Sequence, residues 1–213
     1  MSKKITIVLV DDHAVVRAGI RRLLEQEPIF EVIGEADSGE KGYQIFGELN
    51  PDVMVIDLSM PGMGGLEAIR RILMRHDKAK ILVLSMHEDL SFANQALKLG
   101  AKGYLIKNTL GDDLVKSIHA IANGEVFLSD EIAKKIAMHS IVGDQDPIHN
   151  LSAREFEIFR LLAEGLEVDA IAKTLNVSSK TVSNYQTTIK QKLNITTPVE
   201  LIRYAIKAGV IKN

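Results

Sequence analysis

Acidic, hydroxyl and amine side chains stand at the ends of four apolar runs in this sequence. Asp11 and Asp12 directly follow the first run, and Asp57 ends a later one. Ser85 and Lys107 end two further runs. If the runs are strands of an open α/β sheet, a ligand binds beyond their carboxyl ends, where these five side chains would converge. The spacing therefore predicts one site that combines three carboxylates, a hydroxyl and an ammonium group.

Three carboxylates crowded together require a cation or bound protons. Two like charges about 4 Å apart repel by about 4 kcal/mol at an effective dielectric of about 20. Carboxylate oxygens without cysteine or histidine ligands suit a hard cation such as Mg²⁺. A metal beside a carboxylate, a lysine and a hydroxyl is suited to phosphoryl transfer, in which one carboxylate attacks while the cations neutralise the phosphoryl oxygens. Each acid alone could merely cap a strand or a helix, but the five positions together favour such a site.

The elements that must position these residues are five short apolar runs separated by helical patterns. The runs are rich in Val, Ile and Leu, as in strands buried on both faces of a parallel sheet, and they cover 5–10, 30–36, 53–57, 80–85 and 103–107. Helical spacing recurs between and after them, at about 13–26, 38–49, 65–76, 89–99 and 110–123. Five successive βα units predict an α/β fold, a doubly wound five-stranded parallel sheet, over residues 1–124.

Composition sets broad limits on the class of protein. Of the 213 residues, 46% are hydrophobic and 25% are charged, which is typical of a globular protein with one or two domains. The sequence has no cysteine, so disulfides and thiolate chemistry are excluded. No run approaches 18 apolar residues, and the first apolar run is too short for a signal peptide. A cytoplasmic protein is therefore expected.

The charge is unevenly distributed along the chain. The formal net charge is −2, but residues 151–213 carry nine Lys and Arg against six Asp and Glu, a net charge of +3. Residues 170–199 contain four lysines and no acid. A basic segment without acids suits a polyanionic partner.

The second half of the chain changes character. Residues 125–149 are predicted to be a linker with one helix at about 130–139, followed by an acidic, breaker-rich stretch at 143–147. Residues 150–213 show no strand pattern. They show four helical patterns, two of which begin with capping-box sequences at Ser152 and Thr197 and stop at glycine. A small all-α four-helix domain is therefore predicted.

The third of these helices, at about 179–193, has one apolar and one polar face. On a helical wheel Val182, Ile189 and Leu193 align, with Tyr185 beside them. The opposite face is polar, has no acid, and consists of residues that can all donate hydrogen bonds. Such a face can enter a DNA major groove, whereas an ordinary solvated face usually mixes Glu with Lys. The candidate DNA contacts are Lys180, Thr181, Ser183, Asn184, Thr187, Thr188, Lys190 and Gln191, and Lys192 flanks them.

The motifs around the acidic residues resemble the receiver domain of response regulators, within about residues 4–123. They are Val10-Asp11-Asp12-His13, Pro51-Asp52-Val53-Met54-Val55-Ile56-Asp57, Leu84-Ser85 and Gly100-Ala101-Lys102-Gly103-Tyr104-Leu105-Ile106-Lys107. The resemblance implies that Asp57 accepts the phosphoryl group. The implied Mg²⁺ ligands are Asp12, Asp57 and the backbone carbonyl of Ser59, with Asp11 acting through water. Ser59 and His87 occupy positions that tune phosphate lifetime in such domains.

The same resemblance assigns roles to the remaining residues of the site. Lys107 would pair with the phosphoryl group, the Ser85 hydroxyl would bind it, and the rotamer of Tyr104 would follow Ser85. Asn108 departs from the family pattern, since many receivers have proline there. His13 is expected to pack locally at the start of the first helix.

The C-terminal region resembles the four-helix DNA-binding domain of LuxR-type regulators. Its motifs are Leu151-Ser152-Ala153-Arg154-Glu155, Leu162-Ala163-Glu164-Gly165 and Val177-Ser178-Ser179-Lys180-Thr181-Val182. With a receiver in front, the chain resembles the NarL/FixJ class of response regulators. That class implies a sensor histidine kinase or small-molecule phosphodonor, double-stranded DNA, and a homodimer when phosphorylated. Ser183, Asn184 and Thr187 would face bases, and Lys180 and Lys190 would be candidates for phosphate contacts.

Two other interpretations remain at this point. A metal-dependent phosphohydrolase also uses an aspartate nucleophile, but it usually has a second acid two residues later, where this chain has Ser59. The chain could also be a transcription regulator that acts without phosphorylation and uses its receiver for protein interaction. The sequence favours a phosphorylated regulator that is not an enzyme.

Overall fold

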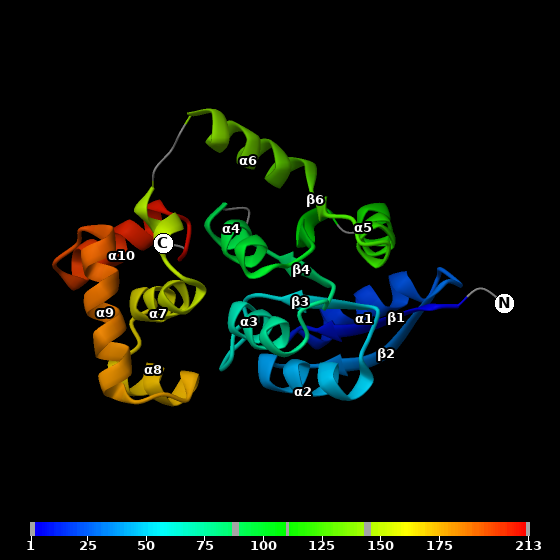
Figure 1. The fold of residues 1–213 in the computed structure, drawn as a ribbon, viewed down its shortest axis with the longest axis horizontal. Coiled ribbons are helices and arrows are strands. Elements are labelled where there is room, and N and C mark those ends of the chain that lie inside the picture. Colours follow the sequence, from blue (N-terminus) through cyan, green and yellow to red (C-terminus); the bar gives the residue numbers. More distant parts are fainter. Residues whose placement is uncertain (1–2, 87–89, 110, 143–145, 212–213) are drawn as a thin grey trace. The chain divides into compact units, whose positions relative to one another are not determined.

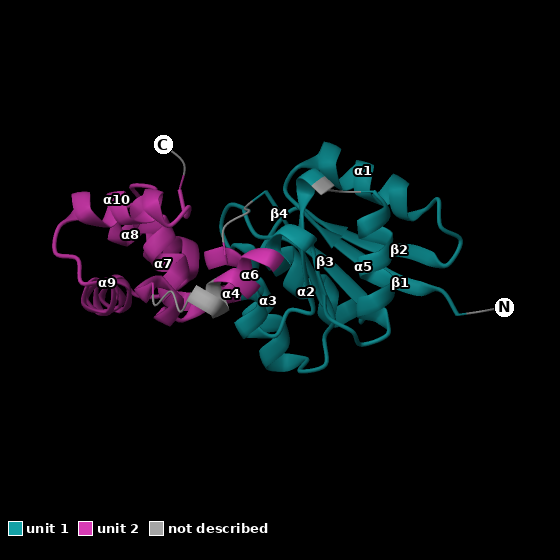
Figure 2. Cartoon of the chain, turned by 90° about the horizontal axis from the view of Figure 1, so that it is seen from above, with its two compact units in different colours: residues 1–88, 96–133 teal, residues 89–95, 134–213 magenta. Residues whose placement is uncertain are grey.

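The computed structural model describes residues 3–86, 90–109, 111–142 and 146–211 (Figure 1). The chain divides into two compact units (Figure 2). The first, called the receiver unit below, comprises residues 1–88 and 96–133, and the second, the helical unit, comprises residues 89–95 and 134–213. Among the described residues, we find no helix with the length and apolar character that a membrane span requires.

The receiver unit is built on a parallel sheet. Its strand order is β2-β1-β3-β4-β5-β6, and every neighbouring pair is parallel, as the predicted doubly wound fold requires. The strands are β1 (Ile5–Val10), β2 (Phe30–Ala36), β3 (Val53–Asp57), β4 (Ile81–Ser85), β5 (Gly103–Ile106) and β6 (Phe127–Leu128). The prediction of five strands is corrected to six, because β6 pairs with β5. It has two residues, too few to show a periodic pattern.

Helices follow each of the first five strands. They are α1 (Ala14–Leu24), α2 (Gly39–Leu49), α3 (Gly65–Arg75), α4 (Leu90–Leu99) and α5 (Asp112–Ala122). Apolar side chains of α1 and α5, such as Leu24 and Ile118, form one buried core with Leu9 and Val55 of the sheet. Helix α2 packs closely over β1, since a Cβ on Gly42 would lie only 2.9 Å from a Val10 side-chain atom. The sheet is thus covered by helices, and the central strands β3, β4 and β5 are fully buried.

The connection between the sheet and the last four helices is mostly helical. Helix α6 (Asp130–Val142) follows β6 and extends beyond the predicted end at residue 139. A short 3-10 helix, η2 (Pro147–Asn150), follows, and the Asp146 side chain accepts a hydrogen bond from Ile148 N at 3.0 Å. The breaker-rich stretch was predicted at 143–147, and its residues 143–145 lie outside the described residues.

The helical unit contains α7 (Ala153–Ala163), α8 (Val168–Leu175), α9 (Ser179–Leu193) and α10 (Pro198–Lys207). Both expected capping boxes are formed, at Ser152 before α7 and at Thr197 before α10. Asn176 and Asn194 end α8 and α9 in the left-handed conformation, at φ of 52° each. Buried side chains, including Phe156, join these helices into one core.

Candidate functional site

The carboxyl ends of β1 and β3 bring two aspartates together. Val10 pairs in register with Ile56, so Asp11 and Asp57 follow at the same edge of the sheet. Lys107 begins the short 3-10 helix η1 (Lys107–Thr109) after β5 and reaches both acids. Its Nζ lies 2.7 Å from Asp11 Oδ2 and 3.0 Å from Asp57 Oδ2. Side chains from three strand ends therefore meet at one point.

Burial and charge oppose each other at Asp57. The residue is 2% exposed, and one carboxylate oxygen, Oδ1, accepts a hydrogen bond from Leu58 N at 2.8 Å. Burial raises the pKa of Asp57 above its usual value, although Lys107 acts in the opposite direction. Burial alone would lower the pKa of Lys107, but its hydrogen bond to Asp11 and the charge of Asp57 raise it. Asp57 is thus a buried carboxyl group beside Lys107, whose ammonium group stays charged.

The backbone after β3 fits tightly around this acid. Gly65 N donates to the Leu58 carbonyl at 3.0 Å, and a Cβ on Gly65 would lie 2.1 Å from the Asp57 carbonyl oxygen. No side chain fits there without moving the backbone. The glycine therefore allows α3 to begin directly against the end of β3, which fixes the position of Asp57.

The oxygen atoms at this edge fit a hard cation. Ligand atoms of Asp11, Asp12, His13 and Asp57 all lie within 4.8 Å of one another. Asp12 Oδ1 is buried and accepts no hydrogen bond in the described structure, so its lone pairs are available to a metal. Carboxylate oxygens of this kind suit Mg²⁺. The donor set therefore agrees with the cation implied by the sequence.

His13, which the sequence placed next to the acids at the start of the first helix, also contacts them with its side chain. Its Nδ1 is 2.9 Å from Asp12 Oδ1 and 3.3 Å from Asp11 Oδ1, although the first contact lacks the alignment of a hydrogen bond. Its backbone N–H donates to Asp11 Oδ1 at 2.8 Å. The residue is the N-cap of α1 but makes no side-chain cap. Its position next to Asp12 in the sequence was the signal available beforehand.

The other predicted receiver residues occupy the neighbouring strand ends. Ser85 is fully buried at the end of β4 and pairs in register with Ile106, the residue before Lys107. Tyr104 is fully buried within β5. Ser59 is exposed just after β3. His87 lies outside the described residues.

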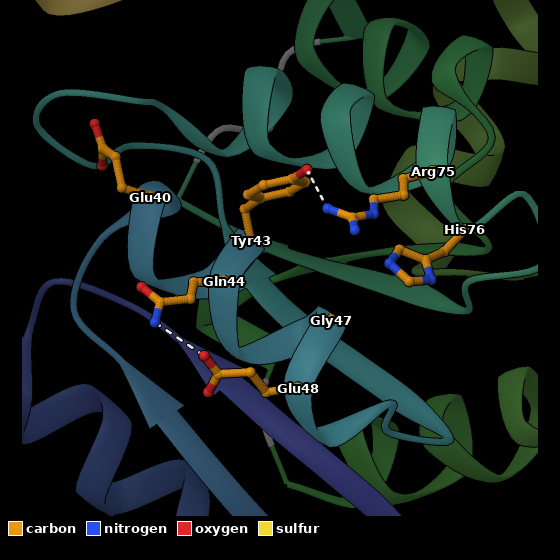
Figure 3. A pocket seen from close by; sticks show the side chains of 7 residues that line it. All are labelled: Glu40, Tyr43, Gln44, Gly47, Glu48, Arg75 and His76. Carbon is orange, nitrogen blue, oxygen red and sulfur yellow. Dashed lines mark hydrogen bonds between the residues drawn. The ribbon is translucent and has the colours of Figure 1, made fainter.

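A separate hollow of about 540 Å³ lies beside α2 and the end of α3 (Figure 3). Its polar groups largely bond to one another. Arg75 Nη1 donates to the Tyr43 hydroxyl at 3.5 Å, and Gln44 Nε2 donates to Glu48 Oε1 at 2.9 Å. None of its lining residues belongs to the acidic cluster, and we assign no function to it. They are Glu40, Tyr43, Gln44, Gly47, Glu48, Arg75 and His76.

In the helical unit, α9 has the two faces that its sequence predicted. Val182, Ile189 and Leu193 are buried. The Ser178 side chain caps the helix by accepting from Thr181 N at 3.1 Å. Of the candidate DNA contacts, Thr181, Thr188 and Lys190 are half-buried, whereas the others are exposed, namely Lys180, Ser183, Asn184, Thr187 and Gln191. We call this set of eight residues the polar face of α9.

Lys192, which the sequence placed beside this face, makes contacts within the fold. Its Nζ lies 2.7 Å from Glu155 Oε2 and 3.3 Å from the Asn150 carbonyl oxygen. Burial alone would raise the pKa of Glu155, but hydrogen bonds from Lys192 and Ser152 lower it. The lysine thus stabilises a buried carboxylate of α7.

Comparisons with known proteins agree with both units. The family model of the response regulator receiver domain matches residues 7–119, and that of bacterial regulatory proteins of the luxR family matches residues 149–205. The response regulator UvrY of Escherichia coli K12 is 38% identical, over 97% of this chain and 95% of its own. The response regulator GacA of Pseudomonas aeruginosa is 36% identical, over 97% and 98%.

A solved structure extends the likeness to the fold. RcsB from Salmonella enterica serovar Typhimurium, bound to the promoter rprA with the phosphomimetic BeF3-, matches with a TM-score of 0.76 and 30% identity. The match covers 95% of this chain and 98% of that one. The chain therefore belongs to the NarL/FixJ class of two-component response regulators, transcription regulators in which a receiver domain is joined to a LuxR-type DNA-binding domain.

Proposed function

We propose that phosphorylation of Asp57 is the trigger of this regulator. The observation that supports it most directly is the position of Lys107 Nζ, which lies 2.7 Å from Asp11 and 3.0 Å from Asp57. In the same site, Asp12 Oδ1 accepts no hydrogen bond. An Asp57 oxygen attacks the phosphorus of a sensor-kinase phosphohistidine or a small acyl phosphate. The bond from phosphorus to the donor breaks as the new one forms.

The chain's own residues prepare this transfer. The Leu58 N–H holds one oxygen of Asp57, and Lys107 is placed to neutralise charge on the incoming phosphoryl oxygens. Asp11, Asp12, Asp57 and the Ser59 carbonyl would hold Mg²⁺. When bound, this cation supplies positive charge that lowers the repulsion between the carboxylates and the phosphoryl group.

The phosphoryl group then changes the neighbouring strand ends. It adds a charge of about −1.5 to −2 at one point. The buried Ser85 hydroxyl would bind it and Tyr104 would follow, which remodels the surface formed by residues 85–107. The altered surface favours a homodimer, and two copies of the helical unit then bind one DNA duplex more tightly than one. This predicts cooperative binding to inverted repeats in promoter DNA.

The DNA contacts are assigned to the polar face of α9. Support comes from the exposure of five of its eight residues, from the absence of acids between residues 170 and 199, and from the RcsB relative whose structure holds promoter DNA. A regulator of this kind acts on the bacterial chromosome, so we place it in the cytoplasm. We also infer that it is not an enzyme, since its relatives are transcription regulators. Negligible turnover of p-nitrophenyl phosphate would agree with that inference, and multiple turnover would refute it.

The decisive experiment compares the wild type with Asp57→Asn. Beryllofluoride with Mg²⁺ should raise the DNA affinity of the wild type by tenfold or more and shift it toward dimer, as read by fluorescence anisotropy and sedimentation. The Asp57→Asn variant should show neither change. Asp77→Asn is the matched control, since Asp77 is an exposed acid of the same unit. Equal affinity and oligomeric state with and without beryllofluoride in the wild type would refute the trigger.

A further inference from the structure

Three hydroxyl groups of α9 donate their hydrogen to the helix backbone. Ser183 Oγ donates to the Ser179 carbonyl at 3.0 Å, and Thr187 Oγ1 donates to the Ser183 carbonyl at 3.0 Å. Thr188 Oγ1 donates to the Asn184 carbonyl at 3.2 Å. All three belong to the polar face, and each bond runs four residues back along the helix. Each of these side chains can donate a hydrogen bond, but its one donor hydrogen is bound to a carbonyl of the same helix.

A hydroxyl has one hydrogen to donate and two lone pairs that accept. When the hydrogen points to a carbonyl of the previous turn, the lone pairs remain for a partner outside the helix. The hydroxyls of Ser183 and Thr187, both on exposed residues, therefore present acceptors to whatever binds this face. The face has no carboxylate, so these acceptors carry no negative charge that would repel a polyanion.

In a DNA major groove, an acceptor selects among bases. Adenine N6 and cytosine N4 present hydrogen-bond donors there, whereas guanine O6 and thymine O4 present acceptors. We propose that Ser183 and Thr187 each accept a hydrogen bond from an amino-bearing base, adenine or cytosine, on the strand that the hydroxyl faces. Since every base pair has one such base, the preference is for the strand that carries it, A·T over T·A and C·G over G·C. This inference rests on the proposed function of α9 in DNA binding and adds its base preference.

The spacing of the two residues indicates which base pairs they read. They are four residues apart, which is about 6 Å along the helix axis and nearly one full turn. Base pairs of a duplex are about 3.4 Å apart. The two hydroxyls therefore address different base pairs, so binding is expected to depend on two major-groove amino groups within each half-site. Lys180, exposed on the same face, has no acceptor and is suited to a phosphate.

The test begins with selection of binding sites from random duplexes by the full chain in beryllofluoride and Mg²⁺. The selection gives the half-site sequence in which the two contacted amino groups are then located. In the selected duplex, 2-aminopurine then replaces each adenine of the half-site in turn, or 2-pyrimidinone each cytosine, which removes one major-groove amino group at a time. Loss of one neutral hydrogen bond should weaken binding by roughly three- to tenfold.

Variants of Thr187 assign this loss to the hydroxyl. Thr187→Val keeps the shape but has no acceptor, so it should bind the amino-bearing and analogue duplexes equally well. Thr187→Ser keeps the hydroxyl and should retain the discrimination of the wild type. If adenine is selected, 7-deazaadenine is the matched control. It keeps the amino group but lacks N7, so it should bind like adenine to a hydroxyl that accepts.

Three results would overturn the proposal. They are undiminished binding after removal of every major-groove amino group of the half-site in turn, undiminished discrimination by Thr187→Val, or a loss with 7-deazaadenine that depends on the Thr187 hydroxyl. The last would show that the hydroxyl donates. These results leave beryllofluoride-dependent DNA binding intact and so refute only the base preference. Absence of any beryllofluoride effect on DNA binding would instead refute the phosphorylation trigger, and failure to bind any duplex would refute the assignment of DNA contacts to α9 and the base preference with it.

Discussion

Replacement of Lys107 by methionine should destabilise the receiver unit. The lysine Nζ contacts Asp11 and Asp57, and both acids are almost fully buried. Methionine keeps a long apolar side chain but carries no charge. The two carboxylates would then face each other without the lysine between them, and removal of one partner from a buried pair typically costs about 3–5 kcal/mol.

The distances in the site give an independent magnitude for the free energy of unfolding that is lost. Nζ is 2.7 Å from Asp11 Oδ2 and 3.0 Å from Asp57 Oδ2, so those two oxygens are at most about 5.7 Å apart, the sum of the two distances. At an effective dielectric of about 20, two unit charges at that separation repel by about 3 kcal/mol. For a unit of this size, that loss should lower the unfolding temperature by roughly 10 °C.

The same effect should depend on pH. Burial raises the pKa of Asp57, and loss of the Lys107 charge should raise it further. A carboxyl group whose pKa is higher in the folded state binds its proton more tightly there than in the unfolded chain. It therefore favours folding in acid and loses that advantage as the pH rises through the folded-state pKa. The destabilisation by Lys107→Met should be small in acid and full at neutral pH.

Calorimetry of the full chain at acidic and neutral pH measures this change. Lys116→Met is the matched control, because that lysine of α5 is exposed and lies a loose 3.7 Å from Asp113, a contact worth little. Added Mg²⁺ should restore part of the loss in Lys107→Met by binding the same carboxylates. An unfolding temperature within about 2 °C of the wild type at neutral pH, or one that Mg²⁺ leaves unchanged, would refute the electrostatic reasoning.

The helical unit offers two further tests. Hydrogen bonds from the backbone of Thr196 and Thr197 lower the pKa of Glu200 to about 2, so its cap stabilises α10 above the usual glutamate pKa and is lost as the pH falls toward about 2. Glu200→Ala should lower the unfolding temperature at neutral pH and remove this acid sensitivity, as followed by circular dichroism. Lys192→Met should destabilise the unit because a buried carboxylate loses its partner, but it should leave the salt dependence of DNA binding unchanged. Lys180→Met should leave stability unchanged and reduce the slope of log K against log salt by about one, and an unchanged slope would contradict a phosphate contact there.

The sequence predicted the receiver fold because its central strands β3, β4 and β5 are buried on both faces, which leaves continuous apolar runs. It missed β6, because the two residues of that strand carry no periodicity. Their pairing depends on the chain returning to β5 after α5: Phe127 N donates to the Lys102 carbonyl at 3.0 Å, and Ser129 N donates to the Tyr104 carbonyl at 3.1 Å. Contacts between such distant segments are set by tertiary structure and leave little trace in a local pattern.

In the candidate site too, local sequence patterns predicted some residues, whereas contacts between distant segments were missed. Residue types at the strand ends were enough to place Asp11, Asp57 and Lys107 at one edge, since parallel strands end together. The ion pair of Lys192 could not be predicted from the sequence, because its partner Glu155 lies 37 residues away on another helix. The helical wheel assigned Lys192 to a flank of the polar face from its angle alone.

A helical wheel places the hydroxyl residues of α9 on the correct face, but it does not show where their hydrogens point. A carboxylate would be the stronger acceptor for an adenine or cytosine amino group, but between phosphates it would add repulsion. Serine and threonine are neutral acceptors, and they act as acceptors alone when their own hydrogen is bound to the carbonyl four residues earlier. Such back-bonds slightly weaken a helix, and α9 offsets this with its Ser178 cap and its buried apolar face. The helix thus gives up a little stability to present acceptors without negative charge, a combination that suits the proposed reading of amino groups on a polyanion.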